Sequence, residues 1–209
     1  MSAIASNAQD STATKSKEAS ADGFGLSAGI VYGNLRMDKV SQFVPGSDKA
    51  LTASPKSALG LSAALFYEFG KPELSFRIAT EANFLQTYVE YDSGVQNKVE
   101  GYVYPVTIEV PIMGMYHFQK KFPFSIGIGP RVIFPISLFN SSHPETNQAG
   151  LNVDFALSKK IPLKNTAMRI ELAYSLGLTN LLLSTPDDYY TNNIPSIKRD
   201  ILAVRFYFN

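Results

Sequence analysis

The chain has 209 residues, a formal net charge of +1 at pH 7, and neither cysteine nor tryptophan. This length suits one domain of ordinary size, and the small net charge gives no electrostatic reason to expect a nucleic-acid partner. The lack of cysteine excludes a disulfide framework and a thiolate metal site. No stretch approaches the roughly 20 consecutive apolar residues of a membrane-spanning helix, which leaves a strand-based membrane protein open because only every second residue of a barrel strand faces lipid.

The first 22 residues differ in composition from the rest of the chain. They are rich in Ser, Ala, Thr and Lys and carry no apolar periodicity, which predicts a disordered tail at 1–22 followed by one barrel domain at 23–209. Ser6-Asn7-Ala8 before Gln9 resembles the small-residue end of a secretory cleavage site. We therefore expect an export signal of which most is absent from this sequence.

From Phe24 onward, apolar residues recur at every second position, the period of a strand with one apolar face. In the last segment, for example, Leu202 and Val204 alternate with Ala203 and Arg205. Eight segments share this alternation, with apolar faces in residues 24–32, 59–69, 74–84, 102–112, 124–136, 151–157, 168–178 and 202–208. Most are long enough to cross a bilayer at a tilt, which takes about 9–11 residues.

The connections between these segments alternate in length. The short ones each contain lysine and lie around Gly70–Glu73, Gln119–Lys121 and Lys159–Asn165. The mostly longer ones are richer in Ser, Asn, Asp and Pro and lie around Asp38–Pro55, Asp92–Lys98, Phe139–Ala149 and Leu183–Pro195. Outer-membrane barrels have short periplasmic turns and long outer loops, so we expect an eight-stranded antiparallel up-and-down barrel with both termini in the periplasm.

The type of charge indicates which face points inward. All thirteen lysines fall in the tail, in connections or at segment ends, whereas four arginines lie within the segments and share the polar face with carboxylates. The planar arginine fork suits pairing in confined space, whereas lysine suits hydrated surfaces. We predict a salt-bridge network inside the barrel made of Arg77, Glu81, Glu109, Arg131, Asp154, Arg169, Glu171 and Arg205. The apolar, aromatic face would then face lipid; the alternative is a lipocalin-like soluble barrel with the apolar face inside.

Eight strands enclose a space just wide enough for side chains to fill. The polar lumen is therefore predicted to be plugged and not to be a channel. Four prolines are a difficulty, because each removes a ladder hydrogen bond. We expect bulges or strand ends at some of Pro105, Pro111, Pro130 and Pro135.

Three stretches resemble the PorT-like outer-membrane β-barrel family of Bacteroidetes. They are the acidic-Pro segment Ile108–Ile112 followed by Met115-Tyr116, the Gly-x-Gly-Pro segment Gly127–Pro130, and the Tyr-x-x-Gly-Leu-x-Asn segment Tyr174–Leu181. The closing Phe206-Tyr207-Phe208 is similar to the aromatic signal of the barrel-insertion machinery. The resemblance, over about residues 24 to 208, implies an outer-membrane location, and a role in secretion or envelope assembly for some members.

Residue patterns for chemistry are sparse. The sequence has no phosphate-binding glycine loop, paired-histidine metal spacing or nucleophile elbow, so we predict no enzyme activity, no cofactor and no metal. His117 is expected to be a structural histidine near a segment end. His143, in an outer loop, could serve an outer-membrane enzyme, and Asp187-Asp188 with Asp92 could hold calcium; a solvated loop explains all of them equally well.

The expected function is that of a non-enzymatic structural or interaction component of the envelope, with outer-membrane lipid and other envelope proteins as partners and no nucleic acid. The alternatives are a narrow channel or small-ligand transporter, and a lipid-modifying enzyme of the outer membrane.

Overall fold

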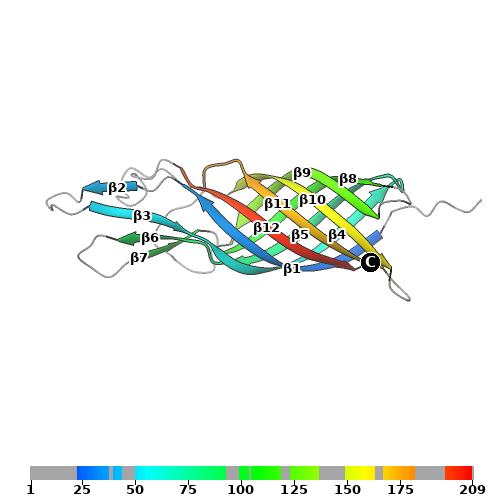
Figure 1. The fold of residues 1–209 in the computed structure, drawn as a ribbon, viewed down its shortest axis with the longest axis horizontal. Coiled ribbons are helices and arrows are strands. Elements are labelled where there is room, and N and C mark those ends of the chain that lie inside the picture. Colours follow the sequence, from blue (N-terminus) through cyan, green and yellow to red (C-terminus); the bar gives the residue numbers. More distant parts are fainter. Residues whose placement is uncertain are drawn as a thin grey trace, which may run out of the picture.

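Eight strands form a closed antiparallel barrel in the computed structural model (Figure 1), which confirms the predicted fold class. The structure describes residues 23–37, 40–43, 50–92, 99–103, 105–118, 123–136, 149–162, 167–181 and 196–208. The barrel strands are β1 (Gly23–Arg36), β4 (Ala58–Gly70), β5 (Leu74–Leu85), β8 (Val106–His117), β9 (Phe124–Pro135), β10 (Gly150–Pro162), β11 (Ala167–Gly177) and β12 (Lys198–Phe208). The predicted tail at 1–22 lies outside the described residues.

Each barrel strand pairs with the barrel strands before and after it in the chain, and β1 pairs with β12 to close the ring. This is an up-and-down topology, which leaves the barrel itself without a free edge. Alternation of buried and exposed residues continues along the strands, as in β5 and β10. No helix among the described residues is long and apolar enough to cross a membrane.

The prolines interrupt pairing without shifting it. Along β8 and β9 the partners are Pro111 with Arg131 and Gly114 with Ile128, so the register on the two sides of the interruption is the same. The bulges expected at the prolines are therefore absent from the register at Pro111 and Pro130. Strand ends do occur at the other two sites, because β9 ends at Pro135 and Pro105 lies just before β8.

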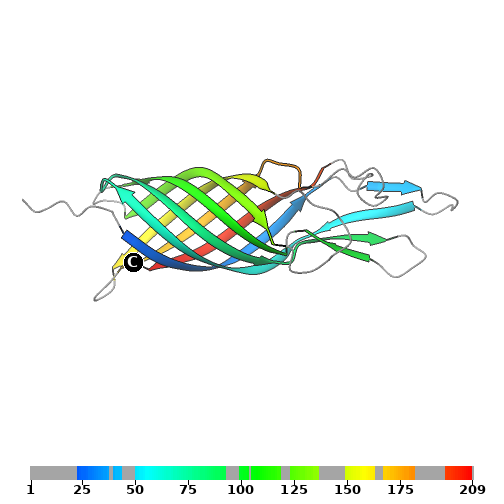
Figure 2. The same ribbon diagram turned by 180° about the vertical axis from the view of Figure 1, so that it is seen from behind.

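A second sheet of four strands, in the order β2-β3-β6-β7, extends from one end of the barrel (Figures 1 and 2). It consists of β2 (Val40–Phe43), β3 (Ala50–Lys56), β6 (Tyr88–Asp92) and β7 (Val99–Tyr102). These strands fall in or beside segments predicted as loops, at 38–55 and 92–98, and Tyr102, predicted in the fourth barrel strand, belongs to β7. The loop prediction was wrong here, because polar composition was taken as evidence against strands although the apolar alternation continues past the barrel.

The two ends of the barrel differ. The C-terminal end of β12 and the start of β1 lie at the end that carries the β4–β5, β8–β9 and β10–β11 connections, opposite the second sheet (Figure 1). The other end carries the β9–β10 and β11–β12 connections as well as the sheet. We call these the short-turn end and the outer end. The sequence-based alternation of connection lengths thus agrees with the architecture.

Candidate functional site

The outward face of the barrel wall is apolar. Leu172, in the middle of β11, exposes 49% of its surface, and Leu61 on β4 exposes 63%. Other large apolar side chains exposed on this wall include Leu26, Ile30, Leu65, Ile78, Ile112, Ile126, Ile128, Phe155, Leu157, Leu202 and Val204. A contiguous apolar surface of this kind is far larger than the patches of soluble monomers. It matches the lipid-facing band of a transmembrane barrel.

Aromatic side chains form a ladder on the outer wall at the short-turn end. The ring centroids of Phe24 and Tyr67 are 4.5 Å apart, those of Tyr67 and Phe69 are 5.8 Å apart, and those of Phe69 and Phe76 are 5.9 Å apart. The ladder crosses β1, β4 and β5. Such aromatic girdles mark the level of the membrane–water interface in transmembrane barrels.

The inward face carries buried charge, with Arg131 of β9 at its centre. Glu81 and Glu109 lie directly opposite each other on β5 and β8, an arrangement of like charges that is destabilising by itself. The Nη1 atom of Arg131 donates to both, at 3.0 Å and 2.6 Å, and its Nε and Nη2 atoms reach the two oxygens of Asp154. One guanidinium thus holds three carboxylates, which its planar fork of five N–H donors allows.

Further arginines extend this cluster. Arg199 donates to Glu109 at 3.0 Å, and Arg205 donates to Glu81 at 2.9 Å. Arg205 also approaches Glu171 at 3.6 Å, and Glu171 accepts from Arg77 at 2.5 Å. The result is a chain of alternating charge along the lumen, Arg199, Glu109, Arg131, Glu81, Arg205, Glu171 and Arg77, in which no member exposes more than 3% of its surface.

A second ion-paired group lies at the short-turn end. Arg169 donates to Glu68 at 2.6 Å, so its partner is not one of the four carboxylates named from the sequence. Glu68 also accepts from the Ser75 hydroxyl at 2.7 Å and lies 3.3 Å from His117 Nε2. His117 Nε2 is 2.8 Å from the Ser75 hydroxyl, and Nδ1 is 2.7 Å from the hydroxyl of Ser125. Both ring nitrogens are therefore engaged in polar contacts.

All eight residues of the predicted network face the lumen, with the pairings described above. The predicted network did not include Arg199, Glu68 or Tyr207, nor the hydroxyls that contact Glu68 and His117. Tyr207 donates to Glu171 at 2.9 Å, and the Arg77 guanidinium lies 4.3 Å from the centre of its ring. Arg199 and Glu68 could have been found in the same way as the named residues. Each is a charged residue at a position of its strand that alternation directs into the lumen.

Strands β1 and β4 supply space for these large side chains. The lumen-facing positions of β1 include Gly29, where an added Cβ would lie 2.5 Å from the Val204 carbonyl oxygen and 3.0 Å from both Arg205 Cγ and the Ser62 hydroxyl oxygen of β4. The two ion-paired groups together contain five arginines (77, 131, 169, 199 and 205) and five carboxylates (68, 81, 109, 154 and 171). Formal charge is thus balanced inside the barrel among the described residues.

Apolar clusters complete the packing inside the barrel and at its outer end. Val31, Leu85, Met113, Met115 and Ile201 belong to one cluster within the barrel. A second cluster joins the outer end of the barrel to the second sheet, and consists of Leu35, Ala53, Val89, Tyr91, Val103, Ile133, Leu181 and Ile197. The interior is thus filled by both ion pairs and apolar side chains, and the apolar part was not predicted.

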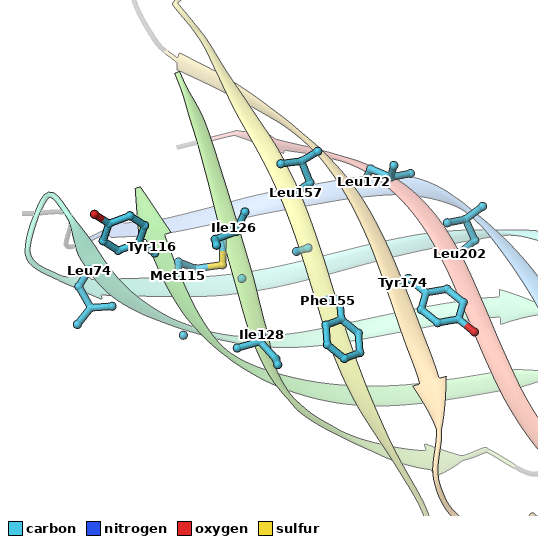
Figure 3. A pocket seen from close by; sticks show the side chains of 13 residues that line it. Leu74, Met115, Tyr116, Ile126, Ile128, Phe155, Leu157, Leu172, Tyr174 and Leu202 are labelled. Carbon is cyan, nitrogen blue, oxygen red and sulfur yellow. The ribbon is translucent and has the colours of Figure 1, made fainter. Parts of the chain in front are cut away.

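The outer wall carries an apolar groove of about 720 Å³ across β8 to β12 (Figure 3). In the figure the lining side chains include Ile126 and Ile128 of β9 and Phe155 and Leu157 of the neighbouring strand β10. Its lining is suited to hydrocarbon and offers little for polar chemistry. We therefore treat it as part of the apolar wall.

The residues of the predicted metal and loop candidates lie mostly outside the part of the chain that the structure describes. Among the described residues no group of three or more His, Asp or Glu side chains is arranged to hold a metal ion. His143 and Asp187-Asp188 lie outside the described residues, and Asp92 is at the end of β6. The predicted enzyme and calcium alternatives at these positions stay predictions.

No protein-family model and no curated protein matches this chain, so the resemblance to the PorT-like family stays a prediction. Among solved structures, the outer membrane protein OprG from Pseudomonas aeruginosa is 11% identical, with a TM-score of 0.43 over 90% of this chain and 96% of that one. Neisserial surface protein A (NspA) is 14% identical, with a TM-score of 0.43 over 88% of this chain and 96% of that one. At this level of similarity neither supports an inference about function, and the fold rests on the strand pairing described above.

Proposed function

We propose that this chain is an integral protein of the bacterial outer membrane whose barrel is a sealed anchor for the sheet at its outer end. The observation that carries the proposal is the inverted distribution of polarity. Apolar side chains cover the outer wall, and arginines and carboxylates are buried inside. A soluble lipocalin-like barrel would have the opposite arrangement, because its outward face must be hydrated.

The lumen supports an anchor over a channel. A conducting pore needs a continuous water path, but Arg131, Glu109 and Arg199 expose 1%, 0% and 1% of their surfaces. Each guanidinium is held by one or more carboxylates from other strands. Opening a path would separate buried charges, which costs several kcal/mol for each pair.

The second sheet supports an interaction role. It extends the fold beyond the apolar wall, and its face away from the apolar cluster carries polar and aromatic side chains such as Lys56, Glu90 and the neighbouring rings of Tyr88 and Tyr102. Surface tyrosines are typical of protein–protein interfaces, where aromatic residues are enriched. In this proposal the short-turn end and both termini face the periplasm, and the outer sheet meets other envelope proteins.

We propose no catalytic function. Of the hydroxyls that contact His117, Ser75 is fully buried, and the nearby Glu68 is already paired with Arg169. A serine nucleophile needs access to substrate and a base that is free to accept its proton. The His117 cluster is better suited to holding strands β4, β5, β8 and β9 together.

Two measurements on protein refolded into lipid vesicles test this proposal. Heat-dependent migration on gels reports barrel formation, and planar-bilayer recording reports conductance, with a known porin as the positive control. We expect heat-modifiable, non-conducting protein. Steady single-channel currents from the heat-modifiable form would contradict the sealed anchor and favour the channel.

A photo-crosslinking residue at Tyr102, on the outer sheet, tests the interaction role. The matched control carries the same residue at Leu172, on the apolar wall. We expect protein adducts in whole cells from position 102 and lipid adducts from position 172. Protein adducts from position 172 alone would show that partners bind the barrel wall and would contradict display by the sheet.

A further inference from the structure

The outer wall contains one carboxylate that breaks its apolar pattern. Asp200 of β12 shares the outward parity of Leu202 and Val204, yet it exposes only 5% of its surface. Its carboxylate is held by Arg36 Nε at 2.7 Å, the Tyr174 hydroxyl at 3.1 Å and the backbone N–H of Gly177 at 2.9 Å. Ionisable groups at the lipid-facing surface of a membrane protein are costly and mark functional sites by default.

A groove of about 360 Å³ opens beside this carboxylate. It is lined by Tyr32, Asn34, Tyr174, Asp200 and Leu202. Tyr32 and Tyr174 expose 42% and 41% of their surfaces, so the groove has aromatic walls. It lies where the apolar wall gives way to polar residues toward the outer end, the level at which aromatic side chains meet lipid headgroups in transmembrane barrels.

Positive charge is in excess around the groove. Asn34 of β1 is the register partner of Asp200 of β12. Two residues nearer the outer end, Arg36 is the register partner of Lys198. Arg36 and Lys198 both have outward parity and lie just beyond the residues that line the groove. Two cations and one carboxylate therefore occupy this part of the wall, and the local charge is +1. Lys198 has no ion-pair partner among the described residues. Asp200 is already neutralised by Arg36, which leaves the Lys198 ammonium to bind an anion.

We infer that the outer edge of this groove, where Arg36 and Lys198 lie, binds the phosphate headgroup of a membrane lipid. The phosphate would contact Lys198 and the exposed side of Arg36, which is 44% exposed. An acyl chain would follow the apolar wall from Leu202 toward the centre of the bilayer. Charge-assisted contacts from lysine and arginine are the usual means of phosphate recognition. The inference rests on the proposed membrane location.

Native mass spectrometry of the heat-modifiable protein in a nonionic detergent tests this inference. The probes are dioleoyl phosphatidic acid, dioleoylglycerol, which lacks the phosphate, and inorganic phosphate, which lacks the chains. We expect phosphatidic acid to bind more tightly than either. Equal binding of dioleoylglycerol would overturn the headgroup site, and equal binding of inorganic phosphate would overturn a lipid as the ligand.

Lys198→Gln is the decisive variant, because Lys198 has no described partner whose loss would disturb the fold. Loss of one charge-assisted contact should weaken binding of phosphatidic acid about tenfold. Lys159→Gln is the matched control, since Lys159 also has outward parity but lies at the short-turn end, over the ring of Phe124. An equal loss in both variants would reveal nonspecific attraction and overturn the site, whereas failure of wild-type protein to become heat-modifiable would contradict the membrane proposal itself.

Discussion

Arg131 shows how single residues make a charged interior tolerable. Burying a charge is costly unless it is paired and hydrogen-bonded, and Glu81 and Glu109 face each other directly across two strands. Arg131 contacts both carboxylates and Asp154. Lysine could not repeat this arrangement, because its compact ammonium lacks the planar fork. The preference for arginine inside and lysine outside therefore has a physical cause at this position.

Glu171 provides a test of the pairing at the residue scale. Replacing it with Gln leaves Arg77 facing a neutral amide, and breaking a buried pair costs about 3–5 kcal/mol. A second change, Arg77→Gln, should recover part of the loss, whereas Arg169→Gln should not, because Arg169 pairs with Glu68. The free energy of unfolding in urea, measured in vesicles, checks both double variants. Recovery by Arg169→Gln instead would contradict the observed pairing.

The inward position of the arginines could be predicted from the sequence, but their partners could not. Parity within a strand follows from alternation, so Arg77 and Arg131 were assigned to the lumen. Which carboxylate meets which arginine depends on the stagger between neighbouring strands, and alternation does not determine that stagger. Glu68 lies near the end of β4 and meets Arg169 of β11 inside the barrel, a contact between residues 101 positions apart.

At the scale of single strands, the close approach of β8 and β9 explains why the residue before Pro130 is a glycine. The backbone carbonyl of Ile112 comes so near Gly129 that an added Cβ would lie 1.8 Å from its oxygen. No real Cβ tolerates such a contact, and the obstacle is backbone, which cannot move aside alone. A Cβ added to Gly114, on the partner strand, would lie 3.8 Å from its nearest neighbour, the carbonyl oxygen of Ile128.

Gly129→Ala should therefore destabilise the barrel by about 2–3 kcal/mol, in the range of overpacked sites. Gly114→Ala should change the stability by less than about 0.5 kcal/mol, as substitutions away from tight contacts do. Urea titrations of the two variants, followed by heat-dependent gel migration, make the comparison. Equal stability of both would mean that β8 and β9 are further apart than described.

The second sheet is the element that sequence analysis missed. Val89 and Tyr91 are buried while the residues between and beside them are only partly buried, so strand periodicity was present in a segment whose neighbouring turn residues predicted a loop. Strands outside the membrane can be short and polar, because only one face needs an apolar partner. Here the partner is the cluster that includes Leu35 and Ile133.

Val89→Asp should release this sheet without opening the barrel. Val89 is fully buried in the cluster at the outer end, and an unpaired carboxylate there would cost several kcal/mol. Glu90→Gln, on the opposite face, should have little effect because surface ion pairs contribute about 0–1 kcal/mol. Limited proteolysis should cut the Val89→Asp variant in the outer segments while the barrel stays heat-modifiable. Loss of heat modifiability would show that sheet and barrel fold as one unit.

For the whole molecule, the distribution of polar and apolar side chains decides which parts of the surface can face lipid and which can face water. Leu172→Arg places a charge in the middle of the apolar wall, which costs about 2–4 kcal/mol at the bilayer midplane. Gln86→Arg makes the same change at an exposed site beyond the wall, where the cost is about 0–1 kcal/mol. The yield of heat-modifiable protein after refolding into vesicles should fall for Leu172→Arg only. Equal yields would count against the assignment of the wall to lipid.

The absence of tryptophan from the chain permits a direct measurement of the central claim, that the apolar wall faces lipid and the outer sheet faces water. Leu172→Trp and Tyr102→Trp each introduce one fluorophore, on the wall and on the outer sheet. In vesicles whose acyl chains carry bromine, we expect strong quenching of the tryptophan fluorescence of the Leu172→Trp variant and little quenching of that of the Tyr102→Trp variant. Aqueous iodide should quench the two variants in the reverse order. Quenching of the Leu172→Trp variant by iodide but not by brominated chains would contradict a membrane-spanning barrel.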